Sequence, residues 1–313
     1  MAEPRRHHLM PQFYLRRFAD ANDQVSVVSR DLKKRFTTSV AKAAAETDFY
    51  AVETTTGEKS QEIEKFLSVI ETHAARALEG MLSGQFPPSD EDRETLALFI
   101  AFQVTRGRAH RQIWATITDA GVKMSALMLA SGETSDIAAR LAAKTGEPAT
   151  ADDVAAVKRL VEDPESWEAV AHQNSAIENM LKAAPQYAPY ISARRWRLAR
   201  FTEPLLLTSD SPVAMWHRTD TRSYGIGLAN ADELRLPLGP RHALVMTAET
   251  GREHTWDLLP HHANDFNRAV AARGYEWIYH TPGRDPLASV RLPPPRPPVE
   301  VVGPPMARDL STR

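Results

Sequence analysis

Apolar side chains recur at helical spacing through the middle of this 313-residue chain. In residues 61–81 they repeat every three or four positions, which is the pattern of an α-helix with one buried face. That stripe stops at Gly84 and the pair Pro87-Pro88, and a nearly all-apolar segment at residues 96–104 predicts a fully buried helix. Further helices are expected at about residues 113–130, 135–144, 151–162, 166–183 and 258–279.

Alternation of apolar and polar positions predicts strands on either side of a helical middle, about residues 60–190. We therefore expect an α+β fold: a mostly helical body with a small antiparallel or mixed sheet formed by the N-terminal region and residues about 195–250. Residues 1–281 are interpreted as a single α+β domain, and residues 282–313, which hold nine prolines, as an extended or disordered tail. The expected strands lie at residues 24–30, 48–52, 196–201, 205–208, 213–216, 233–238 and 243–248.

The charge and cysteine content limit which partners and chemistries the chain can use. Its formal net charge is −2, so binding to nucleic acid would have to use a local basic patch. The chain has no cysteine, which excludes disulfides, thiolate metal ligands and a cysteine nucleophile. It shows neither a signal peptide nor an apolar run of about 18 residues, so we expect no membrane span and a cytoplasmic location.

The segment from Arg5 to Phe18 holds the densest group of chemically capable side chains in the sequence. His7 and His8 stand before a short expected helix, and Arg16 and Arg17 flank the apolar face of that helix. Histidine transfers protons near neutral pH and also binds metals, so either imidazole is a candidate general acid or base. The alternative is that both histidines belong to an exposed basic arm or cap the helix.

A second candidate site is the turn that follows the short apolar strand at residues 205–208. Ser209 and Asp210 lie in this turn, which would hold the Asp210 carboxylate rigidly at a cleft. That carboxylate could orient a histidine, bind a divalent metal or act as a base. Alternatively, Asp210 bonds its own backbone and simply makes the turn. Asn267, in the last expected helix, is a candidate substrate ligand or part of an exposed helix face.

Arg106 follows the nearly all-apolar segment, so its guanidinium is costly to bury without an anionic partner. Glu64 and Glu71 are seven residues apart and share one side of the preceding helix, so either could supply the carboxylate. The other interpretation is that Arg106 binds an anionic ligand.

Several motifs of nucleotide-binding and hydrolytic enzymes are absent. The sequence has no glycine-rich phosphate loop, no H-E-x-x-H, no G-x-S-x-G and no G-x-G-x-x-G. A kinase, a Rossmann oxidoreductase and an α/β-hydrolase are therefore unsupported. A divalent-metal site would have to be assembled from residues distant in sequence.

The string His7-His8-Leu9-Met10-Pro11-Gln12-Phe13-Tyr14-Leu15-Arg16-Arg17-Phe18 resembles the opening motif of a bacterial family, domain-of-unknown-function family 4238. The resemblance groups these residues together and implies no particular reaction. The chain departs from the family pattern at Gly107, and the Pro-rich tail lies outside it. Further resembling segments follow in family order up to about residue 280: Phe49-Tyr50, the helix with Glu64 and Glu71, the Gln103–Arg106 helix, Leu207-Thr208-Ser209-Asp210-Ser211-Pro212-Val213, Pro237-Leu238-Gly239-Pro240, Asn267 and Tyr279.

The first functional hypothesis is a hydrolytic enzyme, such as a phosphodiesterase or nuclease. We expect the opening motif to pack beside the strands of residues 205–248, which would bring His7 or His8 near Asp210. One histidine would act as general acid or base, and Asp210 would orient it or hold a metal. An anionic substrate would bind Arg106 together with Arg16 or Arg17.

The second hypothesis is a non-catalytic module that binds nucleic acid or protein. In this case a patch of Arg5, Arg6, Arg16 and Arg17 would make the contacts, and the histidines would be structural. A third hypothesis is a scaffold or regulator that docks through the Pro-rich tail.

Overall fold

The computed structural model describes residues 6–53, 59–60, 62–218 and 226–294. Among these, residues up to His110 and those from Ile177 onward form one compact unit, and residues 111–176 form a second. The first unit holds most of the strands and all of the expected site residues. The expectation of one domain over residues 1–281 stays a prediction.

Helices make up much of the described chain, which confirms the helical content expected of residues 60–190. Four of them belong wholly to the first unit, and α5 and α6 belong to the second. The helices are α1 (Gln12–Arg16), α2 (Glu62–Leu82), α3 (Asp90–Thr105), α4 (Arg108–Ala130), α5 (Thr134–Thr145), α6 (Ala151–Glu162), α7 (Gln173–Ser192) and α8 (His262–Arg273), with a 3₁₀ helix at Pro164–Ser166.

The strands form small antiparallel and mixed sheets, so the fold is α+β, as predicted. Their orders are β12-β7-β11-β10-β9, β3-β2-β13-β8, β1-β4 and β5-β6. The strands are β1 (Arg6–His8), β2 (Gln24–Ser29), β3 (Arg35–Ser39), β4 (Ala45–Thr47), β5 (Val52–Glu53), β6 (Lys59–Ser60), β7 (Arg195–Phe201), β8 (Thr208–Ser209), β9 (Ala214–Trp216), β10 (Glu233–Gly239), β11 (His242–Thr247), β12 (His254–Leu258) and β13 (Trp277–His280).

The central strands of the five-stranded sheet have buried residues on both faces. Residues such as Trp196 and Met246 on one face join the main core, which also contains Leu67 of α2 and Phe99 of α3. On the other face, Val245 packs with Phe266 of α8. A strand buried on both sides needs apolar residues at successive positions, and the unbroken apolar run at residues 243–246 of β11 meets that need.

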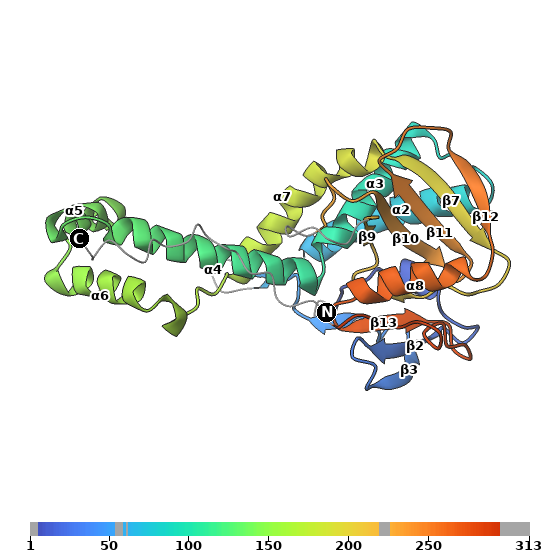
Figure 1. Cartoon of the computed structure of the whole chain (residues 1–313), viewed down its shortest axis with the longest axis horizontal. Helices are drawn as coiled ribbons and strands as arrows, with labels where there is room; N and C mark the ends of the chain where they lie inside the picture. Colours follow the sequence, from blue (N-terminus) through green and yellow to red (C-terminus); the bar gives the residue numbers. More distant parts are fainter. Residues whose placement is uncertain (1–5, 54–58, 61, 219–225, 295–313) are drawn as a thin grey trace. The chain divides into compact units, whose positions relative to one another are not determined.

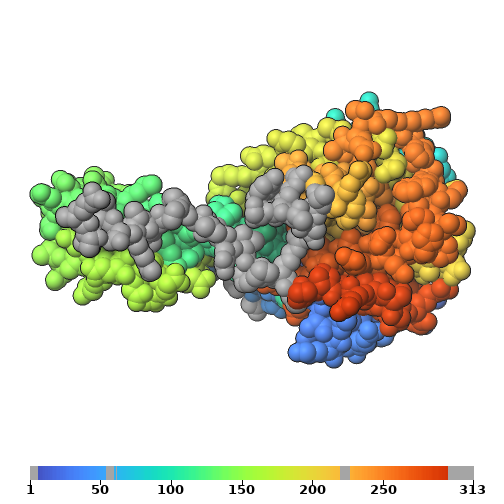
Figure 2. Space-filling view, in the orientation of Figure 1, coloured from blue at the N-terminus to red at the C-terminus, as the bar shows by residue number. Residues whose placement is uncertain are grey.

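The four-stranded sheet joins the two ends of the chain. Strand β13 pairs antiparallel with β2 on one side and with β8 on the other. Helix α8 lies between this sheet and the five-stranded sheet (Figure 1), with Val270 facing a cluster that includes Val28 and Ile278. Figure 2 shows the N-terminal strands, in blue, beside the red segment that follows α8. Residues more than 200 positions apart therefore share one sheet.

Two predicted elements near the ends of the chain are wrong. The strand expected at residues 48–52 is largely a turn, because Asp48 has a φ of 58°, in the left-handed region that ends β4. The helix expected at residues 258–279 covers only α8. It ends at Gly274, and the residues after it form β13, which hydrogen-bonds to two distant strands instead of continuing the helix.

Helix α7 runs later than expected, from Gln173 to Ser192, and contains Pro185 and Pro189. Proline lacks a backbone N–H, so the helix was expected to stop before residue 185. Burial of Ala184 and Ile191 in the main core accompanies its continuation. Tertiary packing therefore outweighs the local preference of proline at these two positions.

The beginning of the Pro-rich tail is packed against the first unit. Residues 282–294 contain neither helix nor strand, but Leu287 and Val290 are buried in the cluster beneath α8. The remainder of the tail lies outside the described residues. None of the helices in the described part of the chain is long and apolar enough to cross a membrane, and the expected cytoplasmic location stays a prediction.

Candidate functional site

The two histidines of the opening motif lie in β1, which pairs with β4. His7 is fully buried, and its Nδ1 accepts a hydrogen bond from the Tyr50 backbone N–H at 2.6 Å. The two rings stack with their centroids 5.7 Å apart. His8 is half-buried, and its Nε2 lies 3.1 Å from the Gln12 amide nitrogen and 3.3 Å from the Ala41 carbonyl oxygen. These contacts hold both imidazoles within the fold, so neither belongs to an exposed arm.

Arg106, at the C-terminal cap of α3, joins this motif to helix α2. Its guanidinium donates to the Glu71 carboxylate and to the His8 carbonyl oxygen, both at 2.6 Å. The Tyr50 hydroxyl donates to the Arg106 carbonyl oxygen at 2.8 Å. Burial lowers the pKa of Arg106, but Tyr50 and Glu71 raise it, and the net shift is upward. The guanidinium is therefore permanently charged, and Glu71 is the carboxylate partner that the sequence predicted as one of two.

Two buried polar atoms beside this network lack a hydrogen-bond partner among the described residues. They are Oε2 of Glu64 and Nε2 of Gln103. Gln103 lies three residues before Arg106, and Glu64 seven residues before Glu71, so each shares a helix face with a member of the Arg106–Glu71 pair. The interface of α2 and α3 is therefore more polar than its apolar pattern predicts.

Asp210 holds the loop between α8 and β13. One oxygen of its carboxylate accepts from the Tyr275 N–H at 2.7 Å, and the other accepts from Glu276 at 2.8 Å and Trp277 at 3.0 Å. Burial raises the pKa of Asp210 from 3.8 to about 6, although the backbone hydrogen bonds from Tyr275 and Trp277 lower it. In the described part of the chain no hydrogen bond joins Asp210 to His7 or His8. The neighbouring Ser209 hydroxyl donates to the Val270 carbonyl oxygen at 3.2 Å.

Arg108 connects the surroundings of His7 with those of Asp210, and the sequence analysis did not single it out. It donates to Glu46, which is opposite His7 in the β1–β4 pair, at 2.7 Å. It also donates to the carboxylate of Glu276, whose N–H binds Asp210. Gly107 lies directly beside the Asp210 carbonyl oxygen. Arg108 could have been noticed in the sequence as a second arginine, two positions after Arg106 and just beyond an apolar helix.

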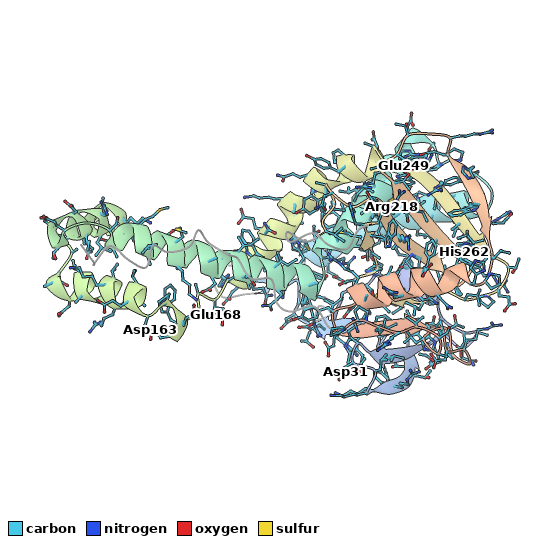
Figure 3. All side chains as sticks on the ribbon, viewed as in Figure 1. Asp31, Asp163, Glu168, Arg218, Glu249 and His262 are labelled. Atoms are coloured by element: carbon cyan, nitrogen blue, oxygen red, sulfur yellow. The ribbon has the colours of Figure 1, made fainter. Side chains whose placement is uncertain are left out.

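Asn267 supports the backbone of the segment before β8. Its side-chain oxygen accepts from the Leu207 N–H at 3.1 Å, and its nitrogen donates to the Leu205 carbonyl oxygen at 2.9 Å. It is buried, so it does not belong to an exposed helix face. At the start of α8, His261 is exposed and His262 is partly buried, and His262 lies beside the end of β12 (Figure 3).

Arg16 and Arg17 line an open groove of roughly 420 Å³ between α1 and the β10–β11 turn, which we call the arginine groove. The Nε of Arg17 donates to the Leu238 carbonyl oxygen at 2.7 Å, so α1 does pack beside the strands of residues 205–248. Arg6 is exposed on β1 and does not line the groove, and Arg5 lies outside the described residues. The groove is lined by Phe13, Arg16, Arg17, Pro204, Gly239, Pro240, Arg241 and His242.

The charges of the arginine groove are predominantly positive. Arg16 pairs with Asp23 at 2.9 Å, and Arg17 lies 3.3 Å from Glu79, whose side chain is 71% exposed. Arg241 is exposed and has no ion-pair partner among the residues that the structure describes. Burial lowers the pKa of His242, and Arg17, Arg200 and Arg241 lower it further. His242 is therefore neutral at pH 7, beside three guanidinium groups.

The structure divides the expected site residues into three places. His7, His8 and Arg106 form one network, and Ser209, Asp210 and Asn267 support backbone around β8 and α8. Arg16 and Arg17 lie in the arginine groove with Arg241 and His242, which fall between the strands expected at residues 233–238 and 243–248. In the described ranges, no group of three or more histidine, aspartate or glutamate side chains could hold a metal ion.

The fold and the groove define an α+β protein with a cationic, partly apolar groove between an N-terminal helix and a β-turn. The chain belongs to the family described as "Protein of unknown function (DUF4238)", whose model matches residues 6–284. This match confirms the family that the sequence resembles. No curated protein and no solved structure matches the chain.

Proposed function

We propose that this protein binds a phosphate-type oxyanion in the arginine groove. The observation that carries the proposal is the convergence of Arg16, Arg17 and Arg241 on one groove, with Arg241 lacking a carboxylate partner in the described structure. Guanidinium groups match the geometry of phosphate oxygens and form strong charge-assisted hydrogen bonds with them. The proposal keeps Arg16 and Arg17 from the basic patch expected of a binding module, and adds Arg241.

The carboxylates near the groove leave room for an incoming anion. The Arg16–Asp23 pair is about half exposed on both sides, and Glu79 is mostly exposed. Exposed ion pairs contribute only about 0–1 kcal/mol, so a ligand phosphate can displace them at little cost. The Nε of Arg17 stays fixed by the Leu238 carbonyl oxygen, which orients the rest of its guanidinium beside the groove.

Titration calorimetry with inorganic phosphate tests the proposal. The variant is Arg241→Gln, because this side chain is exposed and its loss leaves no buried partner. Removing one charge-assisted contact, worth about 1.5–3 kcal/mol, should weaken binding about 10- to 100-fold. Arg252→Gln is the matched control, since Arg252 is an exposed arginine that does not line the groove. Equal affinity of both variants and the wild type would overturn the proposal.

A second candidate function is hydrolysis of a phosphate ester, and His242 favours it. A neutral imidazole beside three guanidinium groups can accept a proton from water while the arginines stabilise developing negative charge. The hypothesis built on His7, His8 and Asp210 assigns the same chemistry to the opening motif. Hydrolysis in the groove and hydrolysis at the opening motif predict that different variants are inactive.

Turnover of a chromogenic phosphodiester by three variants separates these versions. If the groove is the active site, His242→Gln should lower the rate by about 10²- to 10⁴-fold and leave phosphate binding intact. His8→Ala and Asp210→Ala should then retain turnover in proportion to their folded fraction. The reverse pattern would assign the chemistry to the opening motif, and absence of turnover in the wild type would leave binding as the function.

A further inference from the structure

The lining of the arginine groove has two chemically different parts. Arg16, Arg17 and Arg241 supply positive charge, and Phe13 with two prolines supplies an apolar wall. The ring of Phe13 packs on Phe99 of the core, with the ring centroids 5.4 Å apart, so the aromatic part of the wall is held from behind. A bare phosphate would use only the cationic part.

The two prolines of the apolar wall are also fixed in place. The Pro240 carbonyl oxygen accepts hydrogen bonds from the N–H groups of Leu205 at 2.8 Å and Leu206 at 2.9 Å, the two residues that follow Pro204. Proline has no freedom at φ, so this part of the groove loses little conformational entropy when a ligand binds. The wall is therefore preformed.

The size of the groove exceeds that of a phosphate ion. Its volume of roughly 420 Å³ falls in the range of about 300–1,000 Å³ that is typical of sites for small organic ligands. The groove is open to solvent, which does not suit an acyl chain that must be enclosed. A flat, rigid, partly polar group next to a phosphate fits both parts of the lining.

We propose that the arginine groove binds the phosphate end of a nucleotide, with the base against Phe13 and the prolines and the phosphate on the arginines. This inference rests on the proposed oxyanion binding and adds the class of ligand. Bases stack on aromatic side chains with little dependence on sequence, and arginine binds the adjoining phosphate. Neutral His242 can both donate and accept a hydrogen bond, as a ribose hydroxyl or a base edge requires.

Calorimetry on the wild-type chain compares three probes: inorganic phosphate, ribose 5-phosphate and adenosine 5′-monophosphate. The phosphate is common to all three, and only the last carries a base. Stacking of the base should make the nucleotide bind at least about five-fold tighter than ribose 5-phosphate. Equal affinity of these two probes would overturn the inference and leave oxyanion binding intact, whereas failure of all three would overturn both.

Phe13→Leu should remove the preference for the nucleotide and leave the affinity for inorganic phosphate unchanged. Phe36→Leu is the matched control, because Phe36 is an exposed phenylalanine on β3 that does not line the groove. A nucleotide preference that survives in Phe13→Leu would contradict the assigned wall. The comparison of probes on the wild type decides the inference even if Phe13→Leu fails to fold.

A 5′-phosphorylated tetranucleotide and its 5′-hydroxyl form distinguish the source of the ligand. Tighter binding of the phosphorylated strand than of the free nucleotide would identify the end of a single strand as the ligand. Weaker binding of both strands than of the free nucleotide would identify the mononucleotide. Equal binding of the two strands, at the affinity of the nucleotide, would contradict recognition of a terminal phosphate.

Discussion

Arg106 is a buried charge whose partners come from three different segments of the chain. Its side chain is only 2% exposed, and among the carboxylates that the structure describes it pairs with that of Glu71 alone. The α2–α3 hairpin and β1 are both attached to it, through Glu71 and the His8 carbonyl oxygen. Loss of the Glu71 carboxylate would leave this buried charge without its counter-charge. Through these two contacts, Arg106 couples the opening motif to the helical core.

Glu71→Ala should therefore destabilise the protein by about 3–5 kcal/mol, because it leaves the Arg106 guanidinium buried and unpaired. Chemical denaturation at neutral pH measures the change. Glu62→Ala is the control: Glu62 is exposed in the first turn of the same helix, and its loss should cost less than about 1 kcal/mol. Similar costs for the two variants would show that the buried ion pair is not stabilising.

Asp210 should make stability depend on pH in the direction opposite to that of an ordinary ion-paired carboxylate. Its pKa is raised by burial to about 6, above the unfolded value of 3.8, so the folded state binds more protons between these pH values. The contribution of this group is full below about pH 4 and is lost as the pH rises through about 6. At about 1.4 kcal/mol per pKa unit, the loss is on the order of 3 kcal/mol.

Asp210→Asn removes this titration, so the stability of the wild type relative to the variant should fall between pH 4 and pH 7.5. Urea denaturation of both proteins at the two pH values measures that difference, and subtraction removes the titration of all other groups. A difference that stays constant, or that grows as the pH rises, would contradict the raised pKa.

At the scale of elements, α1 is attached to both large sheets by one side chain. The Tyr14 hydroxyl donates to the Pro237 carbonyl oxygen of β10 at 2.6 Å and lies 2.9 Å from the Thr208 hydroxyl of β8. Burial raises the pKa of Tyr14, so the phenol stays protonated and remains a donor at any physiological pH. This attachment also fixes Arg16 and Arg17, on the same helix, at the arginine groove.

Tyr14→Phe should cost about 1–3 kcal/mol, because it leaves buried polar groups of both sheets without their partner. It should also weaken phosphate binding, since α1 presents two of the groove arginines. Thermal denaturation and calorimetry measure the two effects. Tyr275→Phe is the control, an exposed tyrosine in the loop before β13, and it should change neither quantity. Loss of stability with unchanged phosphate binding would show that the groove does not depend on this attachment.

Local pattern predicted the elements whose partners lie close in sequence. The α2 and α3 helices and the β10–β11 hairpin agree closely with their apolar periodicity and turn residues. Strand β13 was missed because its partner β2 lies about 250 residues earlier, and its short apolar run also fits the end of a helix. Strands β3 and β12 were missed for a different reason: they lie at sheet edges and are exposed over most of their length, so they lack the buried apolar alternation of a strand.

At the scale of the whole molecule, a net charge of −2 confines anion binding to a local site. Binding of a short phosphorylated single strand should involve at most the three groove arginines. The logarithm of its binding constant should then fall with the logarithm of salt concentration with a slope of about −2, since single strands give about −0.7 per neutralised phosphate.

Fluorescence anisotropy over a series of salt concentrations measures this slope. Arg241→Gln should make the slope shallower by about 0.7, and Arg252→Gln should leave it unchanged. A slope much steeper than −2 in the wild type would mean that a larger basic surface, beyond the arginine groove, contacts the strand.

The sequence by itself determined the α+β class, the family, the helical core and the residues that need a partner. It narrowed the partner of Arg106 to two glutamates, since an apolar helix followed by an arginine demands a carboxylate or an anion. It also marked Arg16 and Arg17 as candidate anion ligands, because two cations flank an apolar helix face. These conclusions depend only on local spacing and on the cost of burying a charge.

Only the tertiary structure decided which candidates share a site. The Asp210 carboxylate accepts hydrogen bonds from three backbone N–H groups of a loop more than 60 residues later. Arg241 and His242, which follow the strand expected at residues 233–238, lie beside Arg17 because α1 packs against the β10–β11 turn. Which candidate residues come together depends on hydrogen bonds and packing between segments distant in sequence. The pattern of apolar and polar positions along the chain does not encode these contacts.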